Sequence, residues 1–421
     1  MNYRMNNGKK IIISILFPII LLFDGISNIR NKTGRIALIL FISFFGYQLI
    51  YNVVGTEFGE GADCAYYSMV FKMSANLSNI SFSEFFSQLG SHDNVDYFNP
   101  ILLYVVSRFT SNPHIYFMVY AFIFASFYIR NIQLILKQCT PNRNKLWRLL
   151  FVVACFIMSV NDFGGIRMPL AFQVFLFGAF RYVFDGRKNG LIWVASSILV
   201  HFSMFAFVIF FFIFLCAYKF NVKYFFIFFV LGHLLNSVDI PFLQQFFALL
   251  PGGVEDRLNL YTNDANMEQF AEGGRFYLGA MNLWGRLDSL VLRWYIPIAV
   301  GLLFFKRVSL NRSEEYLFKL SLYIYSCALV LSNMPSGYRF MLPSSLICFA
   351  TICILYNRNI QAKKILYNFT KLYSPFLILF LFHRFRFILN EVGFSVLYTN
   401  FITMFFVDDN VPILEVIKQI F

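Results

Sequence analysis

The hydrophobic and polar positions of this chain form long apolar runs separated by shorter polar gaps, and the pattern recurs along all 421 residues. The runs are continuous rather than alternating, which excludes the strand pattern of a transmembrane barrel. Inside lipid every backbone amide must find a partner, so helices are the expected element. We predict spans at roughly 11–23, 36–54, 114–136, 149–161, 168–184, 191–202, 203–217, 224–236, 289–305, 317–332, 338–356 and 372–389. The expected fold is an all-α, polytopic integral membrane protein with about 11–12 transmembrane helices, in which residues 1–421 form a single membrane domain.

The charges of the polar gaps differ between the two sides of the membrane. Reading the gaps alternately as inside and outside places 19 Lys/Arg and 4 Asp/Glu on one side, and 8 Lys/Arg and 18 Asp/Glu on the other. Cytoplasmic loops retain Lys and Arg, so the basic set is predicted to be inside. The inside gaps are 24–35, 137–148, 185–190, 218–223, 306–319 and 357–371. The outside segments are 55–113, 161–167, 237–288, 333–339 and 390–421, of which 55–113 and 237–288 are the long extracytoplasmic loops.

The length of the predicted spans carries further information. Several are shorter than the ~20 residues that cross a bilayer upright. Short helices that meet within the membrane usually surround a cavity rather than lipid. Together with the two long outer loops, this pattern indicates a site that opens toward the outer face.

Composition agrees with a membrane protein and narrows the expected partners. Hydrophobic residues make up 58% and charged residues 14% of the chain, and the mean hydropathy of +0.63 excludes an ordinary soluble domain. The net charge of +13 would suggest nucleic acid in a soluble protein, but most of the excess lies in the inside gaps. We therefore expect membrane lipids and no nucleic acid as partners. The seven cysteines show no CxxC spacing and no His/Cys cluster, so the sequence predicts no metal site and no cofactor.

Polar residues at the outer ends of the predicted helices are the candidates for chemistry, because ionisable groups are costly in lipid. Arg167 lies in NDFGGIRMPL and Arg339 in MPSGYRF, both of them turns with Gly and Pro. His201 lies in LVHFSM, where the chain reverses between two short apolar runs. Arg275 and Arg286 belong to the second outer loop, Arg293 lies just inside the helix that follows it, and Asp63 lies in the first outer loop.

Each candidate also has a simpler interpretation. An arginine at a helix end reaches headgroups more often than it binds substrate, and a lone histidine on an apolar segment is more often a packing residue. Asp63 could cap a helix that begins near Cys64. Several of these cations are predicted on the outer face, where Lys and Arg are normally scarce, and this grouping favours a functional role. Six of the eight basic residues predicted there are arginines. Guanidinium groups suit diphosphates and carboxylates.

Four segments resemble one family of membrane proteins. They are GTEFGEGADCAYYSMVFKM, YFNPILLYVVSRFTSNPHIYFMVYAFI, GGIRMPLAFQVFLFGAFRYVFDGRKNGLIWVASSILVHFSMF and SGYRFMLPSSLICFA. The third pairs an Arg-led helix, a short basic turn and a helix that ends in His-x-Ser. These segments resemble the EpsG-like proteins, which belong with the Wzy-type polymerases of bacterial surface polysaccharides. The family's usual acid before proline is Asn99 here, so no role is carried to that position.

The resemblance implies a glycosyltransferase-type polysaccharide polymerase of the bacterial inner (plasma) membrane. Such an enzyme joins undecaprenyl-diphosphate-linked oligosaccharide repeat units into O-antigen or exopolysaccharide chains on the outer face. A hydroxyl of one unit attacks the anomeric carbon of another, and undecaprenyl diphosphate leaves. The expected partners are this lipid-linked oligosaccharide, membrane lipids and, among proteins to consider, a flippase and a chain-length regulator.

That chemistry needs charge neutralisation at the departing diphosphate and a weak base for the attacking hydroxyl. The predicted base is His201 or Asp63, and His201 is preferred because imidazole titrates nearer to neutral pH than an ordinary carboxyl. The predicted diphosphate-binding residues are Arg167, Arg339, Arg275 and Arg286. The residues expected to stack on sugars are Tyr261, Tyr277 and Trp284 of the second outer loop.

Two other classes of protein remain alternatives. A transporter or flippase of the same lipid-linked oligosaccharides could also use outer arginines, but it should keep charges through the membrane depth and show two similar halves. A membrane O-acyltransferase would need its histidine on the cytoplasmic side, whereas His201 is predicted outside. The one-sided polar set favours the polymerase.

Overall fold

The computed structural model confirms an all-α polytopic membrane protein. The structure describes residues 15–50, 63–76, 81, 84, 96–141, 144–159, 166–235, 283–333, 337–407 and 411–420, with backbone alone at 63 and 283–289. These ranges hold fifteen α-helices, three 3-10 helices and no strand beyond two isolated bridges. Three described helical stretches are long and apolar enough to cross a membrane, namely Pro113–Lys137, Gly337–Arg358 and Ile360–Glu391. Five described apolar helices are shorter.

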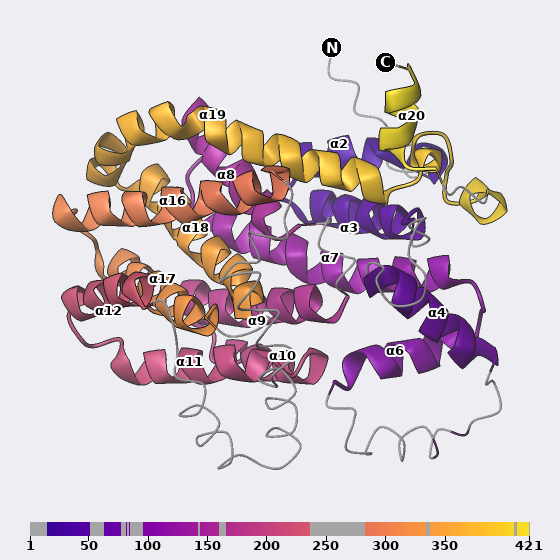
Figure 1. Cartoon of the computed structure of the whole chain (residues 1–421), viewed down its shortest axis with the longest axis horizontal. Helices are drawn as coiled ribbons and strands as arrows, with labels where there is room; N and C mark the ends of the chain where they lie inside the picture. Colours follow the sequence, from indigo (N-terminus) through magenta and orange to yellow (C-terminus); the bar gives the residue numbers. More distant parts are fainter. Residues whose placement is uncertain are drawn as a thin grey trace. The chain divides into compact units, whose positions relative to one another are not determined.

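The chain divides into two compact units, each of which is described separately. The first comprises residues 1–137, 159–204 and 384–421. Its helices up to residue 204 are α2 (Ile19–Ser27), α3 (Lys32–Tyr47), α4 (Asp63–Asn76), α6 (Phe98–Ser107), α7 (Pro113–Lys137), α9 (Arg167–Asp185) and α10 (Gly190–Val200). Beyond the end of α19 it adds η3 (Phe394–Leu397), η4 (Thr403–Phe406) and α20 (Ile413–Ile420). Helix α7 packs against α3 and α9, α9 packs against α10, and α4 packs against α6 (Figure 1).

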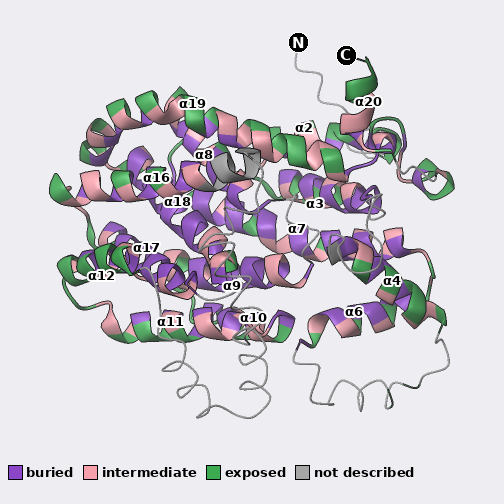
Figure 2. Ribbon diagram, in the orientation of Figure 1, coloured by how far each residue is buried: buried purple, intermediate pink, exposed green. Residues whose placement is uncertain are grey.

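The second unit comprises residues 138–158 and 205–383. Its elements are α8 (Lys145–Ile157), α11 (Met204–Ala217), α12 (Val222–Leu234), α16 (Leu283–Phe305), α17 (Arg312–Leu331), η2 (Gly337–Phe340), α18 (Met341–Arg358) and most of α19 (Ile360–Glu391). Helix α18 contacts α8, α16 and α17, and every residue from Pro343 to Tyr356 is buried. A helix that is apolar on all sides is expected at the centre of a helical unit, and α18 is that helix here (Figure 2).

Helix α19 differs from the sequence prediction. It runs for 32 residues from Ile360 to Glu391, whereas the span was predicted at 372–389 and residues 357–371 as an inside gap. The gap contains three lysines, which lower hydropathy but are good helix formers. The helix therefore continues beyond its apolar part.

The N-terminal helix and the first outer loop also differ from their predicted forms. Of the span predicted at 11–23, residues 11–14 lie outside the described residues. Helix α2 begins after Pro18 and runs to Ser27, beyond the predicted end, and a proline is well tolerated at a helix start. Within the predicted outer loop 55–113, α4 and α6 are regular helices. Helix α4 begins at Asp63, where the sequence suggested a helix start.

Helix α9 is the buried centre of the first unit, and its packing on α10 aligns two candidate residues. All residues from Leu170 to Phe180 are buried. A Cβ atom on Gly178 would lie 2.5 Å from the Gly190 carbonyl oxygen, so the two helices cross in close contact there. The first residue of α9, Arg167, and the C-cap of α10, His201, each lie eleven residues from this crossing, about 16 Å along the helix. The hairpin therefore brings its two ends to the same level.

Candidate functional site

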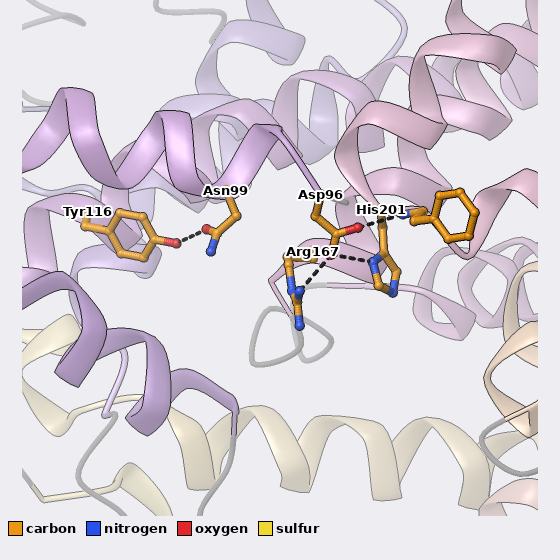
Figure 3. A network of polar contacts seen from close by, with 6 residues as sticks. Asp96, Asn99, Tyr116, Arg167 and His201 are labelled. Atoms are coloured by element: carbon orange, nitrogen blue, oxygen red, sulfur yellow. Dashed lines mark hydrogen bonds and ion pairs between the residues drawn. The ribbon is translucent and has the colours of Figure 1, made fainter. Parts of the chain in front are cut away.

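A buried carboxylate, Asp96, lies between the two ends of the α9–α10 hairpin. Its Oδ2 atom is 2.7 Å from Nη1 of Arg167 and 3.0 Å from Nδ1 of His201. Its Oδ1 atom accepts a hydrogen bond of 2.8 Å from the backbone N–H of Phe202. Figure 3 shows Arg167 and His201 converging on this one carboxylate. We call Asp96, Arg167 and His201 the Asp96 cluster.

The surroundings of Asp96 keep it ionised. Burial by itself would raise the pKa of Asp96. The hydrogen bonds from His201 and Phe202, the charge of protonated His201 and the charge of Arg167 together lower that pKa from 3.8 to about 2. An ionised carboxylate only accepts hydrogen bonds. Nδ1 of His201 must therefore carry a proton and donate a hydrogen bond to Asp96. In the neutral form of the imidazole, Nε2 is then the nitrogen that can accept a proton.

The three side chains of the Asp96 cluster differ in their exposure to solvent. The side chain of Asp96 is 4% exposed and that of His201 is 11% exposed, whereas that of Arg167 is 36% exposed. The guanidinium carbon of Arg167 lies 5.6 Å from the ring centroid of Tyr67 on α4. Arg167 is thus held on two sides while part of its guanidinium faces outward, which suits it to bind an anion.

Local structure holds the two ends of the hairpin beside Asp96. The N–H of Tyr97 donates to the carbonyl oxygen of Leu199, which ties the start of α6 to the end of α10. Ile166, just before Arg167, has a positive φ of 35°. Such a backbone costs about 1–3 kcal/mol for a residue other than glycine. The hydroxyl of Tyr120 donates to the Ile166 carbonyl oxygen and helps to hold this turn.

A second polar pair lies next to the cluster. The Tyr116 hydroxyl donates to Oδ1 of Asn99 at 2.5 Å, which joins α7 to α6 (Figure 3). The ring of Tyr116 stacks on Phe71 of α4 at 5.2 Å. Asn99 occupies the position where the resemblance suggested an acid and to which no role was carried. It links α6 and α7 and thereby supports the segment that carries Asp96.

The structure places the predicted site residues unequally. It brings Arg167 and His201 together, whereas Arg339 lies exposed on η2 of the second unit. Whether Arg339 shares a site with Arg167 stays a prediction. Three of the predicted residues fall outside the described residues, namely Tyr261, Arg275 and Tyr277. Three others have only their backbone described, namely Asp63 at the start of α4 and Trp284 and Arg286 in the first turn of α16.

Asp96 is the residue that sequence reasoning missed. It is one of six acids between residues 55 and 113. The resemblance pointed instead to the position before Pro100, which is occupied by Asn99. The available signal was its place as the last acid before an apolar segment. That signal is weak, since an acid there equally suits a solvated loop. Among the described residues, no group of three or more His, Cys, Asp or Glu side chains is placed to hold a metal ion.

Comparison with known families decides what kind of protein carries this cluster. The sequence model of the EpsG family matches residues 49–400, a range that contains the whole Asp96 cluster. The chain belongs to the EpsG family. No curated protein and no solved structure matches it.

Membership of the EpsG family supports a polymerase of polysaccharide biosynthesis. The Asp96 cluster within this match offers a partly exposed cation beside a histidine. In this EpsG-family chain, the guanidinium can bind an anion, and a neutral imidazole can accept a proton.

Proposed function

We propose that this EpsG-family protein polymerises undecaprenyl-diphosphate-linked oligosaccharide repeat units at the outer face of the bacterial inner membrane, as a multi-pass enzyme. The observation that supports the proposal is the shared carboxylate of Asp96, which contacts both Arg167 and His201. A guanidinium suits a diphosphate, and an imidazole suits the proton of a hydroxyl. The product is an O-antigen or exopolysaccharide chain.

In the proposed reaction, a sugar hydroxyl of one lipid-linked unit attacks the anomeric carbon of another. The new bond joins that oxygen to the anomeric carbon, and the bond between this carbon and the diphosphate oxygen breaks. Undecaprenyl diphosphate leaves with the electron pair. The hydroxyl proton passes to Nε2 of His201, while Nδ1 stays bonded to Asp96. The carboxylate then stabilises the imidazolium that forms.

Arg167 is the proposed clamp for the diphosphate. Departure of the diphosphate concentrates negative charge on its oxygens, and a preorganised guanidinium stabilises that charge. The contact with Tyr67 and the ion pair with Asp96 fix the direction of the side chain in advance. We further propose that Arg339, Arg275 and Arg286 contribute to diphosphate binding. Tyr261, Tyr277 and Trp284 are the proposed stacking surface for sugars.

The direct test is deletion of the gene in its host, followed by complementation with the wild type and with Arg167→Ala. Surface polysaccharide separated on a gel should lose its ladder in the deletion strain and keep a species with a single repeat unit. Wild-type protein should restore the ladder, and Arg167→Ala should not. Loss of all surface polysaccharide, including the single-repeat species, would instead indicate transport and contradict the polymerase.

A matched control separates the site from the general charge of the outer segments. Arg108 lies at the end of α6, where its guanidinium carbon is 4.3 Å from the ring of Tyr104. Arg108→Ala removes the same charge from the same predicted face but lies outside the Asp96 cluster. It should restore the ladder to nearly wild-type length at equal protein level. A similar loss from both variants would count against a specific diphosphate clamp at Arg167.

A further inference from the structure

Two arginines from separate helices contact one aromatic residue of the first unit, and an arginine of a third helix lies close to them. The guanidinium carbons of Arg130 on α7 and Arg181 on α9 lie 5.7 Å and 5.2 Å from the ring centroid of Phe177. Arg35 on α3 reaches the same part of α7, where its Nη1 atom is 3.4 Å from Oε1 of Gln133. We call Arg35, Arg130 and Arg181 the Phe177 arginine cluster.

An aromatic platform holds this cluster. The rings of Phe127, Phe177 and Trp193 contact one another edge to face, with centroids 5.4 to 5.6 Å apart. One residue beyond Arg130, Asn131 donates to both the backbone oxygen and Oε1 of Gln173 and so ties α7 to α9. The backbones beneath the arginines are therefore fixed in relation to each other.

The charges of the cluster are not balanced within the described part of the chain. The charge of Arg130 is opposed by those of Arg35 and Arg181. None of the ion pairs formed among the described residues includes a member of the cluster. Arg130 is exposed and the other two are partly exposed, so all three can be reached from outside the protein. Three neighbouring guanidinium groups, of which Arg130 is repelled by the other two, suit an external anion.

The position of the cluster indicates which anion. Arg130 lies seven residues before the end of α7, about 10 Å along the helix. Arg35 and Arg181 lie near the α3 and α9 ends that the charge pattern places inside. The side chain of Arg130, about 10 Å from the helix end, and the amphipathic ring of Trp193 both suit the headgroup layer of a membrane. Arg130 and Arg181 lie within helices, whereas Arg35 is the last residue of the inside gap 24–35.

We propose that the Phe177 arginine cluster binds the phosphate of an anionic phospholipid headgroup in the inner leaflet. Guanidinium groups pair with phosphate through two parallel hydrogen bonds, and basic sites between helices on the cytoplasmic side are suited to anionic headgroups. The bound phosphate would relieve the repulsion and join α3, α7 and α9. The inference does not depend on the proposed polymerase activity.

The test uses purified full-length protein in detergent and native mass spectrometry with phosphatidylglycerol, phosphatidylcholine or inorganic phosphate added. The wild type should bind phosphatidylglycerol more tightly than phosphatidylcholine. Arg130→Gln and Arg181→Gln should each weaken phosphatidylglycerol binding about fivefold. Arg130→Lys keeps the positive charge and controls for a folding defect. It should weaken phosphatidylglycerol binding less than Arg130→Gln does.

Arg187→Gln is the matched control, because Arg187 is exposed, follows α9 and carries the same charge outside the cluster. It should change binding less than about twofold. If Arg187→Gln and Arg130→Gln weakened phosphatidylglycerol binding equally, the binding would depend on general surface charge rather than on this cluster, and the proposal would be overturned. Equal binding of the two lipids would also overturn it. Inorganic phosphate that displaces the lipid completely at millimolar concentration would assign the site to a soluble anion.

Discussion

Replacement of Asp96 by asparagine removes one charge and almost no volume, so it tests the centre of the candidate site without leaving a cavity. The asparagine oxygen can still accept from the N–H of Phe202. Its amide nitrogen, however, is a donor and would face two further donors, on Arg167 and His201. We expect both side chains to leave their present positions.

The stability effect follows from the pKa of Asp96, which lies at about 2 against an ordinary value of 3.8. This difference corresponds to about 2 kcal/mol in the free energy of unfolding. Because the pKa is lowered by folding, the stabilisation is present above pH ~4 and disappears as the pH falls toward 2. Asp96→Asn should therefore unfold more easily than the wild type at pH 7 and should resemble it near pH 2. Thermal unfolding followed by tryptophan fluorescence measures both.

The activity effect should be larger than the stability effect. Loss of the defined tautomer removes a proton transfer that contributes about 10²–10⁴-fold, and polymerisation of purified lipid-linked repeat units should fall by that factor. Asp96→Glu keeps the charge and should recover part of the rate. Asp185→Asn, at the exposed far end of α9, is the matched control and should change neither property. Wild-type activity in folded Asp96→Asn would refute the role given to the carboxylate.

Three further predictions concern the Asp96 cluster, and a fourth concerns the topology. Arg167→Ala should lower the polymerisation rate about 10²–10³-fold, and Arg167→Lys should restore only part of it because a point charge lacks the guanidinium fork; a full ladder on the gel from the alanine variant would remove Arg167 from the site. His201→Gln should lower the rate about 10²–10⁴-fold in the assay with purified units, and a loss below about threefold would return His201 to a packing role. The double variant Arg167→Ala/His201→Gln should lose less than the product of the single losses in that assay, because both residues act through Asp96; strictly multiplicative losses would contradict this coupling. Cysteines at Ser91 and Thr262, outside the described residues, should react with a membrane-impermeant reagent in outer-permeabilised cells, and protection of both would reverse the predicted topology.

The helical fold could be predicted from the sequence because lipid imposes one rule on every segment. Spans predicted at 191–202 and 203–217 correspond to Gly190–Val200 and Met204–Ala217, since the polar break at His201 coincides with the end of a helix. The prediction was wrong for the start of α19, where the helix continues through a polar segment that was expected to be a gap. Hydropathy reports the environment of side chains, whereas the lysines of residues 360–371 interrupt the apolar run without interrupting the backbone.

The candidate site could be predicted only in part. Arg167 and His201 stood out because an ionisable residue in an apolar context is unusual on its own. Asp96 did not, because its importance lies in partners 71 and 105 residues away. Such a pairing depends on the crossing of α9 and α10 at Gly178 and Gly190, and single-sequence patterns contain no term for that geometry. The aromatic residues of the second outer loop lie outside the described residues, so their stacking role stays a prediction.

The sharing of one carboxylate oxygen has a consequence for the timing of charge in the proposed reaction. With a neutral imidazole the charges of Asp96 and Arg167 cancel, so the cluster attracts a diphosphate through hydrogen bonds more than through net charge. When His201 takes up the hydroxyl proton, the same three residues become positively charged by one unit. That change coincides with the gain of negative charge on the leaving diphosphate, and it requires only a proton to move. Arg167 stays paired with Asp96 and in contact with Tyr67 while this charge develops, so the guanidinium needs no reorganisation when the transition state forms. The added charge therefore acts on the diphosphate mainly in the transition state, where stabilisation accelerates the reaction.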